Sequence, residues 1–151
     1  MKAIIYNGDI EALRPVARSW YDDTHRNSFN VDIDIDAHLA DLHKLIKSDG
    51  SDLLVLIDGI SIVGYMGIET FTSPLSTQKI ANEHYWYVLP EKRGIGSMRF
   101  IQLAQQWAKE KTCSHLIMNA SNLASRAHNK VCQLYERLGM KKFETSYIAE
   151  I

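Results

Sequence analysis

The residues of this sequence best suited to chemistry lie in a short glycine-containing loop, EKRGIGSM. Gly94 and Gly96 allow a sharp turn and a close approach of the backbone to a ligand. An apolar pattern of helical period follows, so several amide N–H groups should point outward where a helix begins and its dipole favours negative charge. Lys92 and Arg93 add positive charge beside them. The loop predicts a site for phosphate or pyrophosphate, although two glycines before a helix also occur in ordinary strand-to-helix connections.

The stretches on either side must position this loop. Residues 85–88 (YWYV) are strong strand formers, and Pro90 should end the strand because it has no N–H to donate. Residues 100–108 carry apolar side chains at helical spacing, which predicts an amphipathic helix. The loop therefore joins the end of a strand to the start of a helix.

The rest of the chain alternates strand-like and helix-like stretches. Asp9 and Asp36 are expected to cap two helices; if the first begins at Ile10, Pro15 should kink it, whereas a later start would accommodate it. Asp58-Gly59 predicts a tight hairpin, and Gly139 predicts a helix end. His38 and His43 are expected at the surface. Strands are expected at 2–6, 52–58, 60–71, 82–88 and 115–121, with a final pair at 140–143 and 145–149, and the polar segment 21–34 is expected to be a loop.

Composition limits the class of protein. The chain has 151 residues, of which 46% are hydrophobic and 23% charged, which indicates one globular domain spanning residues 1–151. A net charge of −1 argues against general binding of nucleic acid or membrane surfaces. No apolar run has the length of a spanning helix, and the N-terminus does not resemble a signal peptide, so a cytoplasmic protein is expected. Cys113 and Cys132 are expected to be free thiols.

The order of strand, V-L-P, E-K-R-G-I-G-S-M and amphipathic helix, with L-Y-E-R-L-G-M further on, resembles the GCN5-related N-acetyltransferase (GNAT) superfamily. The resemblance covers most of the chain and is firm over residues 83–140. It implies an α+β fold of the α/β-sandwich type, whose mixed, largely antiparallel sheet is flanked by about four helices. It also implies binding of acetyl-coenzyme A (acetyl-CoA). No metal is expected, because the histidines are scattered and the two cysteines lie far apart in the sequence.

The resemblance assigns the coenzyme to two neighbouring stretches. The family's loop motif usually reads Gln or Arg, two residues, Gly, one residue, then Gly or Ala. Here the run from Arg93 to Met98 supplies the Arg and the first Gly, but Met98 replaces the final small residue. A second register would put Gly94 and Gly96 on the small positions and Glu91 on the basic one. The backbone of the V-x-P segment would hold the pantetheine arm. The implied coenzyme-binding residues are Tyr87, Val88, Leu89, Arg93, Gly94, Ile95, Gly96, Ser97 and Met98, with Asn122 and Asn129 as candidates near the last helix.

The resemblance also suggests catalytic residues. Tyr135, in the L-Y-E-R-L-G-M segment, matches the family's frequent proton donor to the leaving thiolate, and a phenol can protonate a thiolate of similar basicity. The base that takes the proton of the amine is often a carboxylate on the strand before the loop. Glu83 is the first candidate, His84 the second and Glu69 the third. Strand alternation should send Glu83 and His84 to opposite faces, so one of them would face the cleft.

The function that follows is transfer of an acetyl group from acetyl-CoA to a primary amine of a small molecule or peptide, by direct attack in a ternary complex. The acidic segment 21–34 is either a solvated loop or a surface that attracts a cationic amine. A monomer or a homodimer is expected. A non-catalytic acyl-CoA-binding or interaction module on the same fold is the alternative. A nucleotide-binding P-loop is a weaker one, because the Gly-Lys-Ser/Thr end of that motif is missing.

Overall fold

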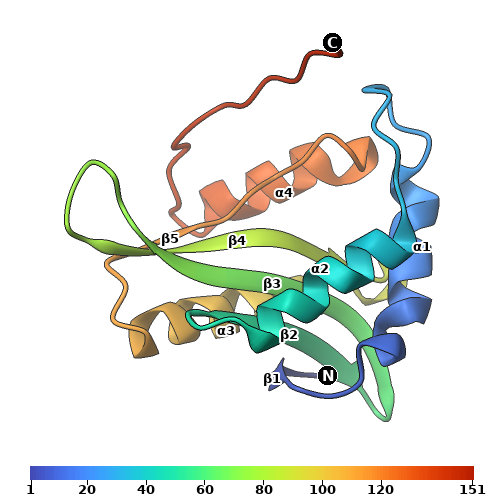
Figure 1. The fold of residues 1–151 in the computed structure, drawn as a ribbon, viewed down its shortest axis with the longest axis horizontal. Helices are drawn as coiled ribbons and strands as arrows, with labels where there is room; N and C mark the ends of the chain where they lie inside the picture. The colour runs from blue at the N-terminus through green and yellow to red at the C-terminus, as the bar shows by residue number, and fades with distance from the viewer. The chain divides into compact units, whose positions relative to one another are not determined.

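The computed structural model describes residues 1–151, except for the side chain of Ser125. The chain forms a mixed, mostly antiparallel five-stranded sheet with four α-helices and two short 3-10 helices (Figure 1). The elements are β1 (Lys2–Tyr6), η1 (Ile10–Leu13), α1 (Arg14–Thr24), α2 (Ile35–Lys47), β2 (Ser51–Asp58), β3 (Ser61–Thr72), β4 (Lys79–Val88), η2 (Pro90–Lys92), α3 (Ile95–Glu110), β5 (His115–Ile117) and α4 (Ser125–Arg137). The α+β fold expected from the resemblance is confirmed.

The chain divides into two compact units. The first comprises Met1–Trp20 and Asp34–Asn119, and it contains the whole sheet with α2 and α3. The second comprises Tyr21–Ile33 and Ala120–Ile151, and it contains α4 and the C-terminal segment. Each unit is described by itself below.

The strands of the first unit lie in the order β1-β2-β3-β4-β5, with antiparallel neighbours except for the parallel pair β4 and β5. That parallel pair joins residues 80–82 of β4 to residues 115–117 of β5. Among the described residues, no strand pairs with this side of β4 beyond Asn82. The two strands therefore diverge in the middle of β4, and the second half of β4 forms an edge.

Helices cover both faces of the sheet. Alternate strand residues point to opposite faces, and Leu56, Met66 and Val88 pack with Phe100, Ala104 and Trp107 of α3 in one buried core. On the other face, the Tyr65 hydroxyl and His38 Nε2 of α2 share a hydrogen bond at 2.9 Å. A Cβ atom at Gly67 would lie 2.5 Å from Leu45 Cδ1, which also belongs to α2. Figure 1 shows α2 crossing β2 and β3 on that face. The loop that precedes α3 is thus anchored by a well-packed helix.

The N-terminal helices differ in detail from expectation. Asp9 caps a 3-10 helix, accepting from the Glu11 N–H, and the α-helix begins only at Arg14, so Pro15 lies in its first turn. This later start removes the kink, because a proline in the first turn interrupts no helical hydrogen bond. Helix α1 continues to Thr24, so the expected loop at 21–34 is helical in its first part.

Three other expectations are wrong. The cap of α2 is Asp34, which accepts from the Ala37 N–H, and Asp36 lies inside the helix. His38 is buried rather than exposed, stacked on Trp20 at 3.9 Å between ring centroids. The strand expected at 115–121 ends at Ile117.

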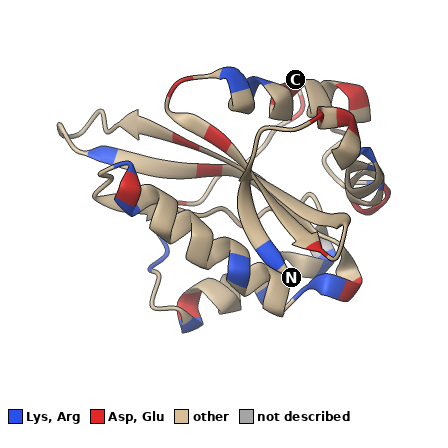
Figure 2. Ribbon diagram, turned by 90° about the horizontal axis from the view of Figure 1, so that it is seen from below, with Lys and Arg blue, Asp and Glu red and all other residues tan. Residues whose placement is uncertain are grey.

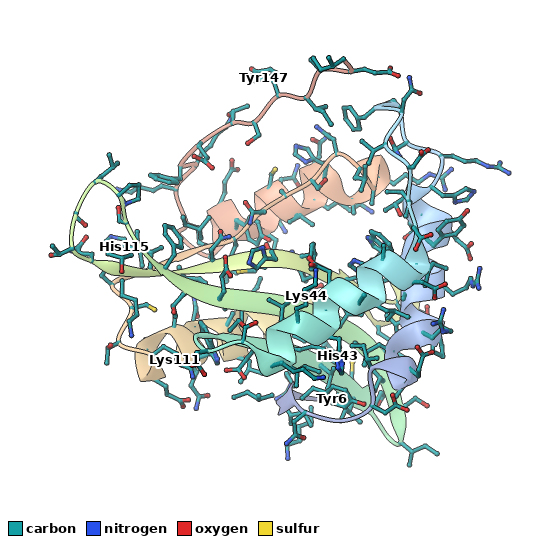
Figure 3. The ribbon with its side chains drawn as sticks, viewed as in Figure 1. Tyr6, His43, Lys44, Lys111, His115 and Tyr147 are labelled. Carbon is teal, nitrogen blue, oxygen red and sulfur yellow. The ribbon has the colours of Figure 1, made fainter. Side chains whose placement is uncertain are left out.

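The second unit holds α4 and the segment that follows it. Gly139 takes a φ of +78°, and Met140 N–H donates to Tyr135 C=O at 3.0 Å, which is the expected left-handed helix end. The final strand pair expected at 140–149 is absent from the described residues; that segment has no regular structure, and Tyr147 is 94% exposed on it (Figure 3). β-forming residues alone do not make a strand without a partner.

Candidate functional site

The loop predicted to bind an anion does lie at the N-terminus of α3. Gly94 is the N-cap, with a φ of +85°, and a Cβ atom there would meet nothing within 4 Å, so its backbone conformation rather than crowding requires glycine. The first intrahelical hydrogen bond runs from Met98 N–H to Gly94 C=O at 3.0 Å. The amides of Ile95, Gly96 and Ser97 come before it, so they have no acceptor within the helix. These three amides lie where the helix dipole is positive.

Gly96 has a different role from Gly94. It is buried, and a Cβ atom there would lie 2.7 Å from Leu56 Cδ2 and 3.3 Å from Val88 Cγ1. The small residue therefore lets the first turn of α3 lie close against β2 and β4. Ile95, by contrast, is 67% exposed. The helix start is consequently fixed to the sheet at Gly96, while Ile95 faces solvent.

Arg93 is held next to this helix start by two contacts. Its Nε–H donates to the Val88 carbonyl oxygen at 3.0 Å, and its guanidinium carbon lies 5.3 Å from the centroid of the Tyr87 ring. Lys92, which the sequence placed in the same positive cluster, instead pairs with Asp58, Nζ to Oδ2 at 2.7 Å. The positive charge beside the loop therefore comes from Arg93, oriented by the end of β4.

At the end of β4, successive residues point their backbone N–H and C=O groups to opposite sides of the strand. Leu89 N–H donates to Val63 C=O at 2.9 Å, so the next hydrogen-bonded pair of the antiparallel ladder is Tyr87 with Tyr65. The N–H and C=O of Val88 consequently point away from β3, toward the edge that β5 leaves. Of the three residues expected to hold the pantetheine arm, the main chain of Val88 alone faces that edge.

A bulge in β4 decides where the candidate bases lie. The strand register pairs Ile68 with Glu83 and Gly67 with Tyr85, so His84 is an extra residue on β4. Glu83 is 1% exposed, and its carboxylate accepts the Asn119 N–H at 2.8 Å, while the Asn119 side chain donates to the Glu83 carbonyl. Burial raises the pKa of Glu83 to about 7, against the opposing effect of the two Asn119 hydrogen bonds. The hydrogen bonds between Glu83 and Asn119 thus lie just beyond the last paired residues of β4 and β5.

His84 and Glu69 form a pair that the sequence did not reveal. His84 Nε2 lies 2.7 Å from Glu69 Oε1, and the two side chains are 32% and 38% exposed. A carboxylate accepts hydrogen bonds, so Nε2 of His84 is the donor in this contact, and in the neutral imidazole Nδ1 is then the nitrogen with the lone pair. His84 and Glu69, which the sequence offered as separate candidate bases, therefore form one pair in which the carboxylate positions the histidine.

The remaining candidates belong to the second unit. Tyr135 lies on α4 and is 8% exposed, whereas Asn122 and Asn129 are exposed. The first unit thus brings together the start of α3, Arg93, Val88, Glu83 and the His84–Glu69 pair. Sequence reasoning missed Asn119, whose contact with Glu83 depends on how β5 leaves β4, and no spacing in the sequence indicates it.

Charge and metal ligands give little further indication of a site. Basic and acidic residues are interspersed along the helices (Figure 2). Within the described part of the chain, no group of three or more His, Cys, Asp or Glu side chains is placed to hold a metal ion. Each helix in the described part of the chain is too short or too polar to span a membrane.

A comparison with sequence models identifies the family of this chain, and comparisons with solved structures show its fold. Residues 15–140 match the sequence model of the Acetyltransferase (GNAT) family. A search of curated proteins found no significant match. Among solved structures, the fold is similar to ribosomal-protein-alanine N-acetyltransferase from Brucella melitensis (TM-score 0.71, 19% identity, 100% of both chains). It is also similar to AAC(6')-Iy bound to the bisubstrate analogue CoA-S-monomethyl-acetylneamine (TM-score 0.72, 16% identity, 100% of this chain and 99% of that one). A transcriptional regulator from Bacillus halodurans gives a TM-score of 0.75 at 18% identity, over 99% of both chains.

Proposed function

This chain belongs to the GNAT family of acetyltransferases, and we propose that it moves the acetyl group of acetyl-CoA to a primary amine by direct attack in a ternary complex. The observation that carries the proposal is the joint placement of the α3 amides, Arg93 and the Val88 edge in one unit. Two structural neighbours, a ribosomal-protein-alanine acetyltransferase and AAC(6')-Iy with its CoA analogue, support amines of a peptide and of a small molecule equally. The proposed acceptor is therefore a small-molecule or peptide amine.

The residues present fit coenzyme A. The amides of Ile95, Gly96 and Ser97 would receive the pyrophosphate, and the Arg93 guanidinium lies beside them to balance its charge. Val88 N–H points to the β4 edge, where it would donate to a carbonyl of the pantetheine arm. The Val88 carbonyl already accepts from Arg93, so this residue contributes a donor rather than both groups.

We assign the base to His84 rather than to Glu83. Glu83 is 1% exposed and its carboxylate is bonded to Asn119, so an amine in solution has no direct access to it. His84 is 32% exposed and has Nδ1 available to accept a proton, while Glu69 stabilises the imidazolium that forms. The free amine then attacks the thioester carbonyl. Tyr135 is proposed to donate its phenolic proton to the departing thiolate, and Asn122 and Asn129 remain proposed coenzyme contacts.

A thiol-release assay with acetyl-CoA across panels of small-molecule and peptide amines tests the proposal. We expect release that depends on one class of amine, with a large loss in Tyr135→Phe and in His84→Asn. Calorimetry should show coenzyme binding that weakens in Arg93→Ala. A failure of acetyl-CoA to bind, even at a concentration that should saturate the site, would refute the acyl-transfer function.

The alternative is a non-catalytic acyl-CoA-binding module, which Met98 at the family's small position favours. It predicts tight coenzyme binding, no transfer to any amine and no effect of Tyr135→Phe on thioester hydrolysis. The same two assays therefore distinguish the two functions.

A further inference from the structure

Two side chains on α4 that the proposed reaction does not use form a thiol–imidazole pair. Cys132 Sγ lies 3.7 Å from His128 Nε2, one helical turn away, and both residues are half-buried. The other ring nitrogen, His128 Nδ1, is buried and has no hydrogen-bond partner among the described residues. The polar contact of this imidazole in the described part of the chain is therefore with the thiol.

The second cysteine of the chain has a different environment. Cys113 follows α3 in the first unit. Burial raises the pKa of its thiol, so a smaller fraction of it is present as the reactive thiolate. Both cysteines are free. Because thiol–disulfide exchange proceeds through the thiolate, a thiol with a neighbouring base should react before a half-buried thiol whose pKa is raised.

We propose that Cys132 is a site of mixed-disulfide formation with low-molecular-weight disulfides such as glutathione disulfide or coenzyme A disulfide, with His128 as the base. His128 Nε2 takes the thiol proton, and the Cys132 sulfur attacks one sulfur of the disulfide. A new S–S bond forms, the old one breaks, and the departing thiolate receives the proton from His128. One disulfide replaces another, so no further oxidant is consumed.

The consequence for activity follows from the spacing on α4 and rests on the proposed function. Tyr135 lies three residues after Cys132, on the same side of the helix, and it is 8% exposed. A tripeptide or a coenzyme attached to Cys132 would crowd this side of α4 and prevent Tyr135 from donating its proton. The modification should therefore stop acetyl transfer, and a thiol reductant should restore it.

Intact-mass spectrometry of the full-length reduced protein tests the modification without any activity assay. We incubate wild type, Cys132→Ser, Cys113→Ser and His128→Gln with glutathione disulfide or with coenzyme A disulfide. One equivalent should add to wild type and Cys113→Ser and none to Cys132→Ser, while His128→Gln should react at least about ten-fold more slowly. The faster of the two disulfides identifies the source. Equal modification of both cysteines, or an unchanged rate in His128→Gln, would overturn the proposal.

Activity is measured in a second step on the same samples. Transfer by wild type and Cys113→Ser should fall in proportion to the modified fraction and return with dithiothreitol, whereas Cys132→Ser should keep its activity. If the mass result holds and no variant transfers an acetyl group, the modification site stands and the proposed function fails. Full modification with unchanged transfer would refute the link to Tyr135.

Discussion

Glu83 is a carboxyl group in the protein interior, and its titration should be visible in the stability of the fold. Burial raises its pKa to about 7, from the value of 4.5 expected in an unfolded chain. Between these values the unfolded state releases a proton that the folded state keeps, so the free energy of unfolding falls as pH rises from about 4.5 to 7. A shift of this size corresponds to a loss of about 3 kcal/mol, complete above pH 7.

The substitution Glu83→Gln should remove this loss, because an amide keeps the acceptor for Asn119 and does not ionise. We expect the variant to gain stability relative to wild type as pH rises from 4.5 to 8, measured by urea unfolding at each pH. The matched control is Glu91→Gln, an exposed carboxyl on η2 that should change little. A Glu83→Gln difference that is constant across this range would contradict the buried-carboxyl interpretation.

The His84–Glu69 pair predicts an order of kinetic effects. His84→Asn removes the proton acceptor, so kcat/KM should fall by roughly 10²–10⁴-fold. Glu69→Gln keeps a hydrogen-bond acceptor but removes the charge that stabilises the imidazolium, so its loss should be smaller. Steady-state kinetics over a range of amine concentrations at saturating acetyl-CoA, on variants whose folding is checked by circular dichroism, measures both. Glu83→Gln should keep most of the activity, and a loss in this variant larger than that in His84→Asn would move the base to Glu83.

At the scale of an element, strand β3 carries two glycines at which an added side chain would crowd different neighbours. A Cβ atom at Gly64 would lie 2.8 Å from the Tyr87 carbonyl oxygen, which is backbone, whereas one at Gly67 would lie 2.5 Å from Leu45 Cδ1, which is the end of a flexible side chain. Backbone in a paired strand cannot move aside cheaply, but a leucine can change its rotamer.

Gly64→Ala should therefore destabilise the protein by about 1–3 kcal/mol, and Gly67→Ala by less. Gly64→Ala should also weaken coenzyme binding, because it pushes Tyr87 and Val88 away from β3 and moves the support of Arg93. Urea unfolding gives the stability and calorimetry the affinity. Equal stability losses at the two glycines would show that Tyr87 moves as easily as Leu45.

Comparison of individual residues with expectation shows how far sequence reasoning reaches. The Asp58-Gly59 hairpin, the Pro90 strand end and the Gly139 helix end follow from local backbone chemistry, and all three are confirmed. The bulge at His84 and the early departure of β5 depend on pairing between strands distant in sequence, so the contact of His84 with Glu69 and of Glu83 with Asn119 could not be foreseen. The predicted strand pair at 140–149 did not form for a related reason: strand-forming residues make a strand only when another strand pairs with them.

At the scale of the whole molecule, the sequence predicts one domain, and unfolding can test this because the chain divides into two compact units that can be followed separately. One domain should unfold in a single transition, with coincident curves from different probes. The three tryptophans, Trp20, Trp86 and Trp107, all lie in the first unit, so their fluorescence reports on that unit. Far-ultraviolet circular dichroism also includes α4 of the second unit.

Coenzyme A gives this test a second variable. A ligand at 100 times its Kd stabilises the folded state by about 2.7 kcal/mol, which for a chain of this length should raise Tm by roughly 5–10 °C. If the chain is one cooperative domain, fluorescence and circular dichroism should shift together. Arg93→Ala, at the same coenzyme concentration, should show a smaller shift because its Kd is higher. A fluorescence transition that moves while a separate dichroism transition stays in place would show that coenzyme binding stabilises the first unit alone.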